Sequence, residues 1–329
     1  MSETETKVQA SGISLGQLSE YFGRPAGAVA GEVKNFQMDC RGTLDEPQSW
    51  RGTIVAQIDN VRQNGIALDQ VGINIAAENG TATVREARID RGRNHLRLEG
   101  TVQLPKTTEG FRRTPGDLRL TIDAPNLQEL TAFLPTPLTG SLQAIGTIKT
   151  ENSIAHLELT ARGDLIGFGK LAVKTLNAKI SATKKLPATD ATKEPFYANL
   201  TSSIHAELND VRYDQFVVDN VRAEIKSKEA TVSLEPVTLQ RNNDLLFVRG
   251  NYQLPPPGST EFRLTRQPAD LQFSFRAPQL SDYWQSDAPN KVTGEFRPTA
   301  RCAFARVRRA GRSIFMDEKL RPRDFSLGK

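Results

Sequence analysis

Hydrophobic and polar residues alternate with a period of two over most of the chain. The clearest run places Leu96, Leu98, Gly100, Val102 and Leu104 on one side, with charged or polar residues between them. In a β-strand, successive side chains point to opposite faces of the sheet. The alternation therefore predicts strands with one apolar face and one solvated face.

Turn signals separate these runs and predict an antiparallel meander. Asn79-Gly80, Asn64-Gly65 and Asn242-Asn243 each fall between two alternating segments. Longer breaks rich in proline predict surface loops at residues 105–115, 184–195 and 255–268.

Three short segments depart from the alternation and predict amphipathic helices. They lie at residues 15–22, 127–133 and 280–284, and an extended run beginning at Gly31, Gly140 or Gly294 follows each one. No long amphipathic helix is expected to cover a broad sheet.

Much of the sequence is an internal repeat. At an offset of 150 residues, Arg62 recurs as Arg212, Asp69 as Asp219 and Gly100 as Gly250; the match continues at slightly larger offsets to Thr139-Gly140 and Thr293-Gly294. A register that survives two loop insertions indicates a duplication. The expected organisation is a disordered stretch at 1–11, the end of a preceding unit at 12–53, a full unit at 54–203, a partial unit at 204–300 and a basic tail at 301–329.

The apolar side of this sheet poses a physical problem. Each large apolar side chain gains about 1.5 to 3 kcal/mol on leaving water, and large exposed apolar patches mark binding sites or aggregation hazards. The sheet is therefore expected either to fold over on itself or to hold something apolar.

The basic character of the chain belongs to its end. The net charge is +5, but residues 301–329 contribute +6, so the preceding residues are nearly neutral. This tail could bind nucleic acid or an anionic membrane surface. A solvated end is the favoured interpretation, because stacking aromatics are not interleaved with the arginines; we expect no nucleic-acid partner.

The sequence offers little catalytic or metal-binding chemistry. His95, His156 and His205 are scattered and are expected to be exposed strand residues, and Cys40 and Cys302 are expected to be unpaired or inert thiols. The glycine-containing segment 163–170 lacks the order of a phosphate-binding loop and is interpreted as a turn. Asp59 and Asp69 suit turns better than a catalytic carboxylate pair. We expect no enzyme activity, cofactor or metal.

The order of these elements resembles the AsmA-like proteins of bacterial envelopes, especially the TamB translocation and assembly module. The resemblance covers about residues 12–300 and depends on the order of a short helix such as 126–130, the run 138–142, a turn such as 42–47, the runs 58–61 and 66–69, and the strand 94–104. The family implies an all-β fold, in which a long, twisted antiparallel sheet is folded into a taco-like trough lined with apolar side chains. It also implies a periplasmic location, an inner-membrane anchor outside the given chain, and carriage of phospholipid to the outer membrane.

The resemblance implies no catalytic residues, and what transfers is the inward-facing set of side chains, with phospholipid acyl chains as their ligand. The expected groove-lining residues are Leu96, Leu98, Val102, Leu104, Leu118, Leu120, Ile122, Leu246, Val248, Tyr252, Leu254, Leu271, Phe273 and Phe275.

Two alternatives to a lipid conduit stay open. In the first, the sheet edge binds strands of outer-membrane proteins during their assembly or translocation. In the second, the chain is a structural β-solenoid with a closed core. Solenoid repeats are usually 20 to 50 residues long, so the 150-residue offset argues against that alternative.

Overall fold

A computed structural model describes residues 3–21, 29–43, 45–63, 66–186, 197–254, 268–277 and 299–304. The chain divides into two compact units, Met1–Ala172 with Thr183–Asp190, and Val173–Ala182 with Ala191–Lys329. Within the described ranges each unit is an antiparallel β-sheet, and the first unit also has short helical segments at its strand ends. The all-β prediction is confirmed. The expected helix at 280–284, the turn at 64–65 and most of the basic tail lie outside the described residues.

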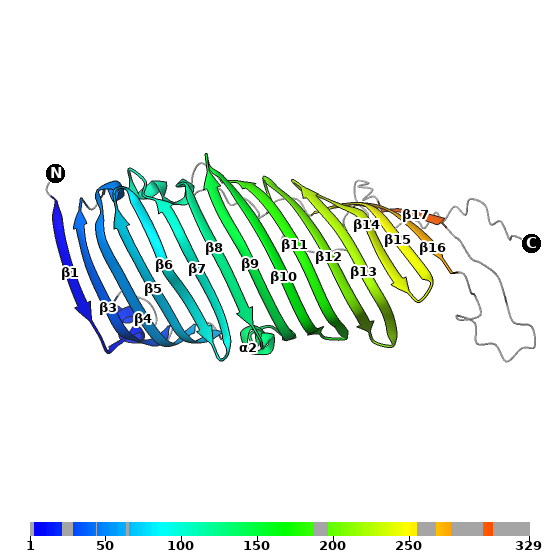
Figure 1. Cartoon of the computed structure of the whole chain (residues 1–329), viewed down its shortest axis with the longest axis horizontal. Coiled ribbons are helices and arrows are strands. Elements are labelled where there is room, and N and C mark those ends of the chain that lie inside the picture. Colours follow the sequence, from blue (N-terminus) through cyan, green and yellow to red (C-terminus); the bar gives the residue numbers. More distant parts are fainter. Residues whose placement is uncertain are drawn as a thin grey trace, which may run out of the picture. The chain divides into compact units, whose positions relative to one another are not determined.

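The first unit contains two strands at its start, β1 and β2, followed by a meander from β3 to β10 (Figure 1). Its strands are β1 (Thr4–Ala10), β2 (Ile13–Ser14), β3 (Ala30–Gly42), β4 (Arg51–Gln63), β5 (Ile66–Glu78), β6 (Thr81–Arg91), β7 (Asn94–Gln103), β8 (Gly116–Ala124), β9 (Thr139–Glu151) and β10 (Ile154–Phe168). The short helices are α1 (Leu15–Tyr21) and α2 (Leu127–Thr131), and the 3-10 turns are η1 (Pro47–Ser49) and η2 (Thr108–Arg113). Both expected helices of this unit are confirmed.

Each strand from β3 to β10 pairs antiparallel with the next one in the chain. β1 and β2 lie along the other side of β3, where Val8 is opposite Met38 and Ile13 is opposite Val33. Nearest-neighbour antiparallel pairing is a meander, and it does not describe the rungs of a β-solenoid.

The second unit continues the same pattern. Its strands are the central part of β11 (Leu171–Lys185), β12 (Leu200–Tyr213), β13 (Phe216–Lys228), β14 (Thr231–Arg241), β15 (Asp244–Gln253), β16 (Ala269–Arg276) and β17 (Thr299–Phe304). The strands from β12 to β17 pair antiparallel in chain order. Thr175 of β11 accepts a hydrogen bond from the Asn209 side chain of β12 at 3.0 Å.

Two local predictions were wrong. Residues 4–10 are not disordered but form β1, because their alternation places Val8 and Ala10 opposite Met38 and Phe36 of β3. Residues 163–168 belong to β10, with a bulge between Asp164 and Gly167, and the turn is confined to Gly169 and Lys170.

The duplicated sequence forms matching local structures in the two units. The Asp69 carboxylate accepts a hydrogen bond from the Gly92 backbone N–H at 2.5 Å, and Asp219 does the same for Asn242 at 2.5 Å. The backbone N–H of Leu104 donates to Gly80, and that of Leu254 donates to Ala230. These paired contacts indicate that the repeat is structural as well as sequential.

Candidate functional site

One face of the first unit carries three continuous rows of apolar positions. The strand registers place one residue of each strand from β3 to β10 in each row, and each row begins with a residue of β1 or β2, so that a row runs across the strands rather than along them. The central row is Ala10, Phe36, Ala56, Ile73, Ala87, Leu98, Leu120, Gly146 and Leu159. The flanking rows are Val8, Met38, Ile54, Ile75, Val84, Gly100, Leu118, Ile148 and Leu157, and Ile13, Val33, Ile58, Val71, Ile89, Leu96, Ile122, Ala144 and Ala161. Every position in the three rows is apolar or glycine.

The second unit carries equivalent rows on one face. They are Ile204, Ile225, Leu234, Gly250 and Leu271; Ala206, Ala223, Val237, Val248 and Phe273; and Leu208, Val221, Leu239, Leu246 and Phe275. Tyr252 lies on the same face, opposite Val232 and Ala269. Burial raises the pKa of the Tyr252 hydroxyl, which agrees with its apolar surroundings.

The row residues are only partly buried. Leu98, Leu120 and Leu159 all keep solvent exposure, although their in-plane neighbours pack against them. Among the described residues, the buried apolar side chains are Leu104, Ala124, Leu127, Ala144, Val173, Tyr197 and Ala277, and of these only Ala144 belongs to a row. The apolar face of each unit is therefore not a closed core.

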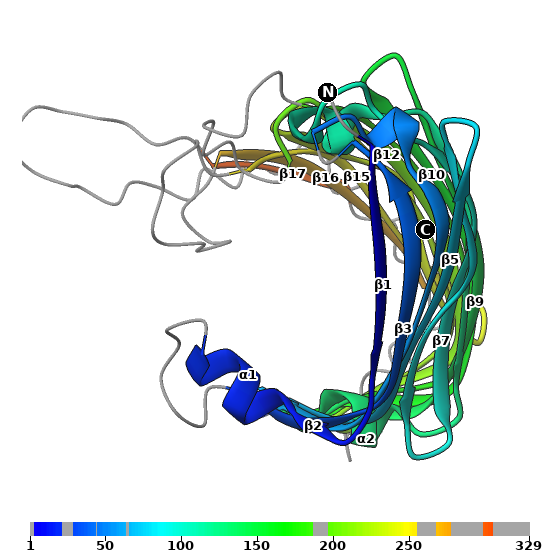
Figure 2. The same ribbon diagram turned by 90° about the vertical axis from the view of Figure 1, so that its left-hand side faces the viewer.

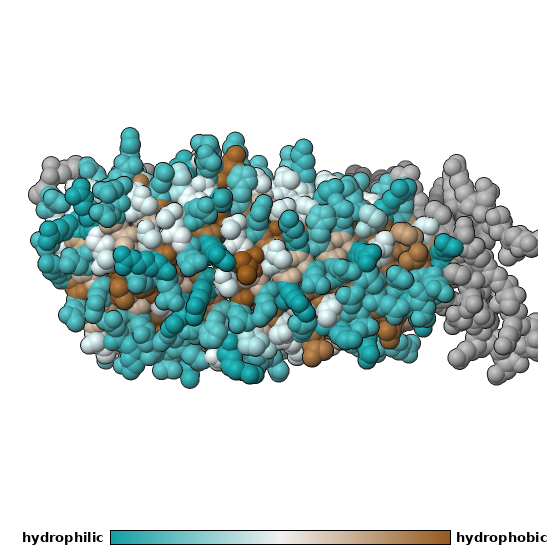
Figure 3. Space-filling view, viewed as in Figure 1, coloured by the Kyte–Doolittle hydropathy of each residue, from teal (hydrophilic) through white to brown (hydrophobic). Residues whose placement is uncertain are grey.

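The opposite face is polar. Figure 3 shows that, in the view of Figure 1, the surface of the first unit consists mostly of hydrophilic residues. Figure 2, turned by 90°, shows that the strands of this unit bend in one direction, away from the side seen in Figure 3. The polar residues therefore cover the convex face, and the three apolar rows lie on the concave face.

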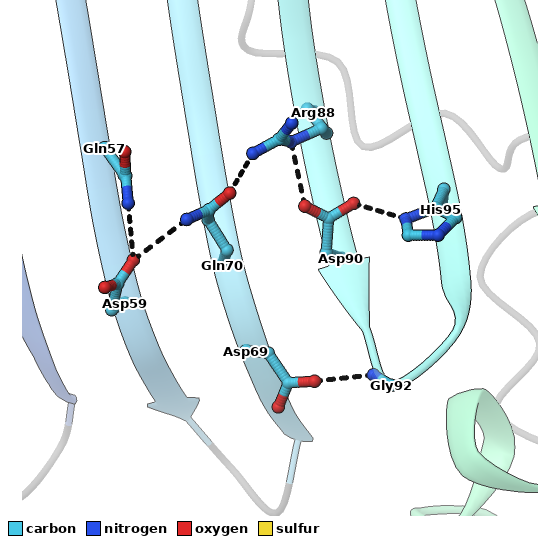
Figure 4. A network of polar contacts seen from close by, with 8 residues as sticks. All are labelled: Gln57, Asp59, Asp69, Gln70, Arg88, Asp90, Gly92 and His95. Atoms are coloured by element: carbon cyan, nitrogen blue, oxygen red, sulfur yellow. Dashed lines mark hydrogen bonds and ion pairs between the residues drawn. The ribbon is translucent and has the colours of Figure 1, made fainter.

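A ladder of side chains crosses four strands on the polar face (Figure 4). The Asp59 carboxylate accepts hydrogen bonds from the side chains of Gln57 (3.2 Å) and Gln70 (3.3 Å). Arg88 donates to Gln70, and its Nε lies 2.8 Å from the Asp90 carboxylate. His95 Nδ1 lies 2.7 Å from the same carboxylate. Surface pairs of this kind contribute about 0 to 1 kcal/mol each, and the ladder links adjacent strands.

This ladder has no catalytic arrangement. His95 contacts a carboxylate, but among the residues of the ladder no serine, threonine or cysteine nucleophile approaches its other nitrogen. His156 and His205 lie on other strands beside Thr183 and Ser203. All three histidines are exposed strand residues, as predicted. In the part of the chain that the structure describes, no group of three or more His, Cys, Asp or Glu residues could hold a metal ion.

The structure places the predicted groove-lining residues of each unit on one face, except for Leu104 and Leu254, which lie beyond the ends of β7 and β15. Leu96, Leu98 and Val102 of β7 share that face with Leu118, Leu120 and Ile122 of β8. The corresponding residues of β15 and β16 share a face in the second unit. Leu104 differs, because only 5% of it is exposed and it lies beyond the end of β7, bonded to Gly80. It packs at a strand end and does not line an open surface.

Sequence reasoning missed most of this face. The rows extend over β3 to β6, β9 and β10, which contribute Phe36, Ile54, Ile73 and Leu159 among others. The alternation was present in these strands too, for example at Ile54, Ala56 and Ile58. Positive-φ residues such as Asn60 (φ 54) interrupt it, and at Asn60 the register of β3 against β4 shifts between the pairs Ala30–Arg62 and Glu32–Asp59.

Cys40 also lies on the apolar side, paired with Thr6 and Gly52. Burial, and secondly the charge of Asp39, raises the pKa of its thiol. The thiol therefore stays protonated at neutral pH, in agreement with the predicted inert character.

Comparison of the chain with protein-family models, with curated proteins and with solved structures finds no significant match. The resemblance to the AsmA-like proteins therefore stays a prediction. No helix within the described ranges has both the length and the apolar character that crossing a membrane requires.

Proposed function

We propose that the protein is a non-enzymatic conduit for phospholipid, in which acyl chains lie against the apolar rows of a taco-like trough. The observation that carries this proposal is the continuity of three apolar rows on a concave face that is only partly buried. The resemblance to the AsmA-like proteins adds the setting, which is the periplasm between the inner and outer membranes of a bacterial envelope.

The mechanism needs only passive sliding. An acyl chain gains about 0.8 kcal/mol for each CH₂ group that it buries, and successive strands offer similar aliphatic side chains, as at Leu118 of β8, Ile148 of β9 and Leu157 of β10. Near-equal binding energy from strand to strand leaves no deep minimum in which a lipid would stop. Headgroups stay in water at the open side, so the trough is unselective for their chemistry along its length.

An acidic substitution in the rows tests this proposal. We expect the double variant Leu98→Asp, Phe273→Asp to fold, because both side chains are partly exposed, and to lose bound lipid, because each carboxylate places charge in the path of an acyl chain. The matched control is Thr121→Asp, Ser274→Asp, which puts the same charges on the opposite face of the same sheets.

The measurement is native mass spectrometry with lipid extraction, after expression in a bacterial periplasm, and circular dichroism checks the fold. Phospholipid bound to the parent and to the control, but not to the row variant, supports the conduit. A parent that is folded and free of lipid, or a row variant that keeps its lipid, contradicts it.

The second candidate is a scaffold for strands of outer-membrane proteins. One observation favours it: among the described residues, β1 pairs on one side only, with β3, so its other side offers backbone N–H and C=O groups to an added strand. A strand peptide that binds the folded protein and slows the hydrogen exchange of β1 would support this function.

A further inference from the structure

The first unit has two rims, where the strands turn, and they differ in composition. One set of strand ends is called the α rim. It includes α1, the end of β4 with the start of β5, the β6–β7 turn, α2 with the following residues 132–138, and the end of β10 with Gly169 and Lys170. The η rim is the opposite set of strand ends, which includes η1 and η2 (Figure 1).

Hydrogen bonds and strand pairing connect the α rim from strand to strand. Asp69 at the start of β5 accepts the Gly92 N–H of the β6–β7 turn. The Asn94 side chain, after that turn, donates to Glu129 of α2 at 3.1 Å. Thr139, at the start of β9, pairs with Gly167 at the end of β10. These contacts make the α rim continuous from the start of β5 to the end of β10.

Large apolar side chains are exposed along the α rim. They are Leu18 (41%), Tyr21 (87%), Ile66 (39%), Phe133 (50%), Leu165 (72%) and Phe168 (50%). Of the other exposed large apolar residues in the described part of this unit, Val8 and Ile145 lie within strands, and only Phe111 belongs to the η rim. Apolar exposure in this unit is therefore concentrated on one rim, where it does not add to the core.

Leu165 is exposed at a cost to the backbone. It occupies the bulge between Asp164 and Gly167 with φ 54, in the left-handed region that costs a residue with a Cβ about 1 to 2 kcal/mol. A leucine side chain relieves none of this strain, and with 72% of Leu165 exposed its burial gains little stability in return. Folding alone gives no reason for this residue, whereas contact with an apolar partner does.

Arginines on the same rim have no acidic partner among the described residues. Arg62 at the end of β4 and Arg91 and Arg93 at the β6–β7 turn make no ion pair within 4 Å in this part of the chain. The carboxylates of the rim are largely engaged: Asp69 with Gly92, Glu129 with Asn94 and Asn126. Asp164 lies 3.9 Å from Arg162. The rim also includes the carboxylate of Glu20 in α1, which is exposed.

The η rim carries a similar mixture of positive and negative residues. Its cations Arg51, Lys106 and Arg113 are accompanied by exposed or partly exposed carboxylates at strand ends and in the β3–β4 connection. These carboxylates are Asp45, Glu46, Glu78 and Glu151. The two rims therefore differ in their exposed apolar side chains and not in their formal charge, and the apolar side chains would favour contact of the α rim with a lipid interface.

The duplication repeats these residue types, arginine beside an apolar residue, in the second unit. Arg62 and Arg91 recur as Arg212 and Arg241, and Ile66 recurs as Phe216. Phe216 is 62% exposed, and its neighbours Tyr213 and Val217 are 58% and 39% exposed. The combination of arginine with an exposed apolar residue is thus present at the same turns of both copies.

We propose that the α rim binds the surface of an anionic phospholipid bilayer, with its apolar side chains at the boundary between headgroups and acyl chains and its arginines on lipid phosphates. Exposed aromatic and aliphatic residues interspersed with cations are the features of proteins that lie on such interfaces. Arginine binds phosphate through a planar fork of donors. This surface is separate from the apolar rows, and its binding does not require that the protein conduct lipid.

Vesicle binding tests the proposal with two variants of equal charge change. The rim variant is Arg62→Gln, Arg91→Gln, Arg93→Gln, and the matched control on the η rim is Arg51→Gln, Lys106→Gln, Arg113→Gln. Co-sedimentation is measured with vesicles of phosphatidylcholine alone and with vesicles that also contain phosphatidylglycerol. We expect the parent to prefer the anionic vesicles. The α-rim variant should lose about fivefold in partitioning per arginine, whereas the control stays close to the parent.

A second pair of variants tests insertion. Phe133→Trp should show a fluorescence blue shift and quenching by brominated acyl chains, and a Leu165→Ser, Phe168→Ser variant should bind both kinds of vesicle less. Equal losses for the two charge variants, or unquenched fluorescence of the vesicle-bound Phe133→Trp variant, would overturn the proposal. The Leu98→Asp, Phe273→Asp variant should still bind vesicles, so failure of the conduit and failure of the rim are distinguishable.

Discussion

At the scale of single residues, glycines allow strands to approach where a side chain would collide. Gly100 has φ 140, and a Cβ added there would lie 2.1 Å from the Asp117 carbonyl oxygen; Gly250 has φ 144 and the same relation, 2.0 Å, to Asp270. Both positions lie in an apolar row and fall at the same point of the repeat. The duplication has therefore kept a backbone requirement as well as a side-chain pattern.

Gly100→Ala should destabilise the first unit by about 1 to 3 kcal/mol, because the new Cβ meets backbone and the positive φ disfavours it. Urea denaturation measures the change. The control is Gly72→Ala on β5, where the nearest atom to a new Cβ is 3.9 Å away and the free energy of unfolding should change by less than about 1 kcal/mol. Equal effects at the two positions would show that the collision is not what fixes Gly100.

The turn carboxylates give a second prediction at this scale. Asp69→Ala removes the acceptor of the Gly92 N–H and should cost about 1 kcal/mol. Hydrogen exchange at Gly92 should become faster, while Asp69→Asn, which retains an oxygen acceptor, should protect this amide better. Exchange at Asn242 should stay unchanged, since Asp219 serves that turn.

At the scale of elements, β1 is a long edge strand, since in the described part of the first unit it pairs only with β3. Its polar side carries ionic contacts: the Glu5 carboxylate lies 2.9 Å from Arg41 and 3.1 Å from Lys7. Hydrogen bonds from Lys7 and Arg41 hold the pKa of Glu5 below its ordinary value of 4.5. Because the folded pKa is lowered, the contribution is present above the pKa of free glutamate and is lost as the pH falls through the folded value.

We therefore expect the exchange of β1 amides to rise on acidification below about pH 4.5, relative to β4 amides measured at the same pH. Glu5→Gln should remove this additional pH dependence and leave β4 unaffected. A parent and a Glu5→Gln variant with the same pH profile would show that these contacts do not hold β1 in place.

At the scale of the whole molecule, the central feature is that the apolar face of each unit does not become a closed core. An open face and a closed core can be distinguished by the loss of unfolding free energy when a side chain is truncated. We compare Leu98, in a row on β7, with Leu104, buried just beyond the end of β7. Leu104→Ala should cost about 2 to 5 kcal/mol, because Leu104 is 5% exposed and the change leaves a cavity. Leu98→Ala should cost much less, because Leu98 already faces solvent on its outer side. Equal costs in urea denaturation would indicate a covered face.

The sequence by itself determined the elements and the repeat. The period-two alternation predicted the strands, Asn79-Gly80 and Asn242-Asn243 predicted turns, and helices α1 and α2 followed from their apolar spacing. These features are local, since strand alternation, turn conformation and helix periodicity depend on neighbours in the chain.

Only the tertiary structure decided which strands face one another and in which register. A row such as Phe36, Ala56, Ile73 and Leu98 exists only because each pair of strands is aligned to the residue, and bulges shift that alignment without an evident sequence signal. Likewise, the pairing of β1 with β3, the burial of Leu104 and the location of residues 133 and 165 at the same strand ends depend on contacts between distant segments. Alternation specifies two faces for every strand, but pairing between strands decides which residues become neighbours on each face.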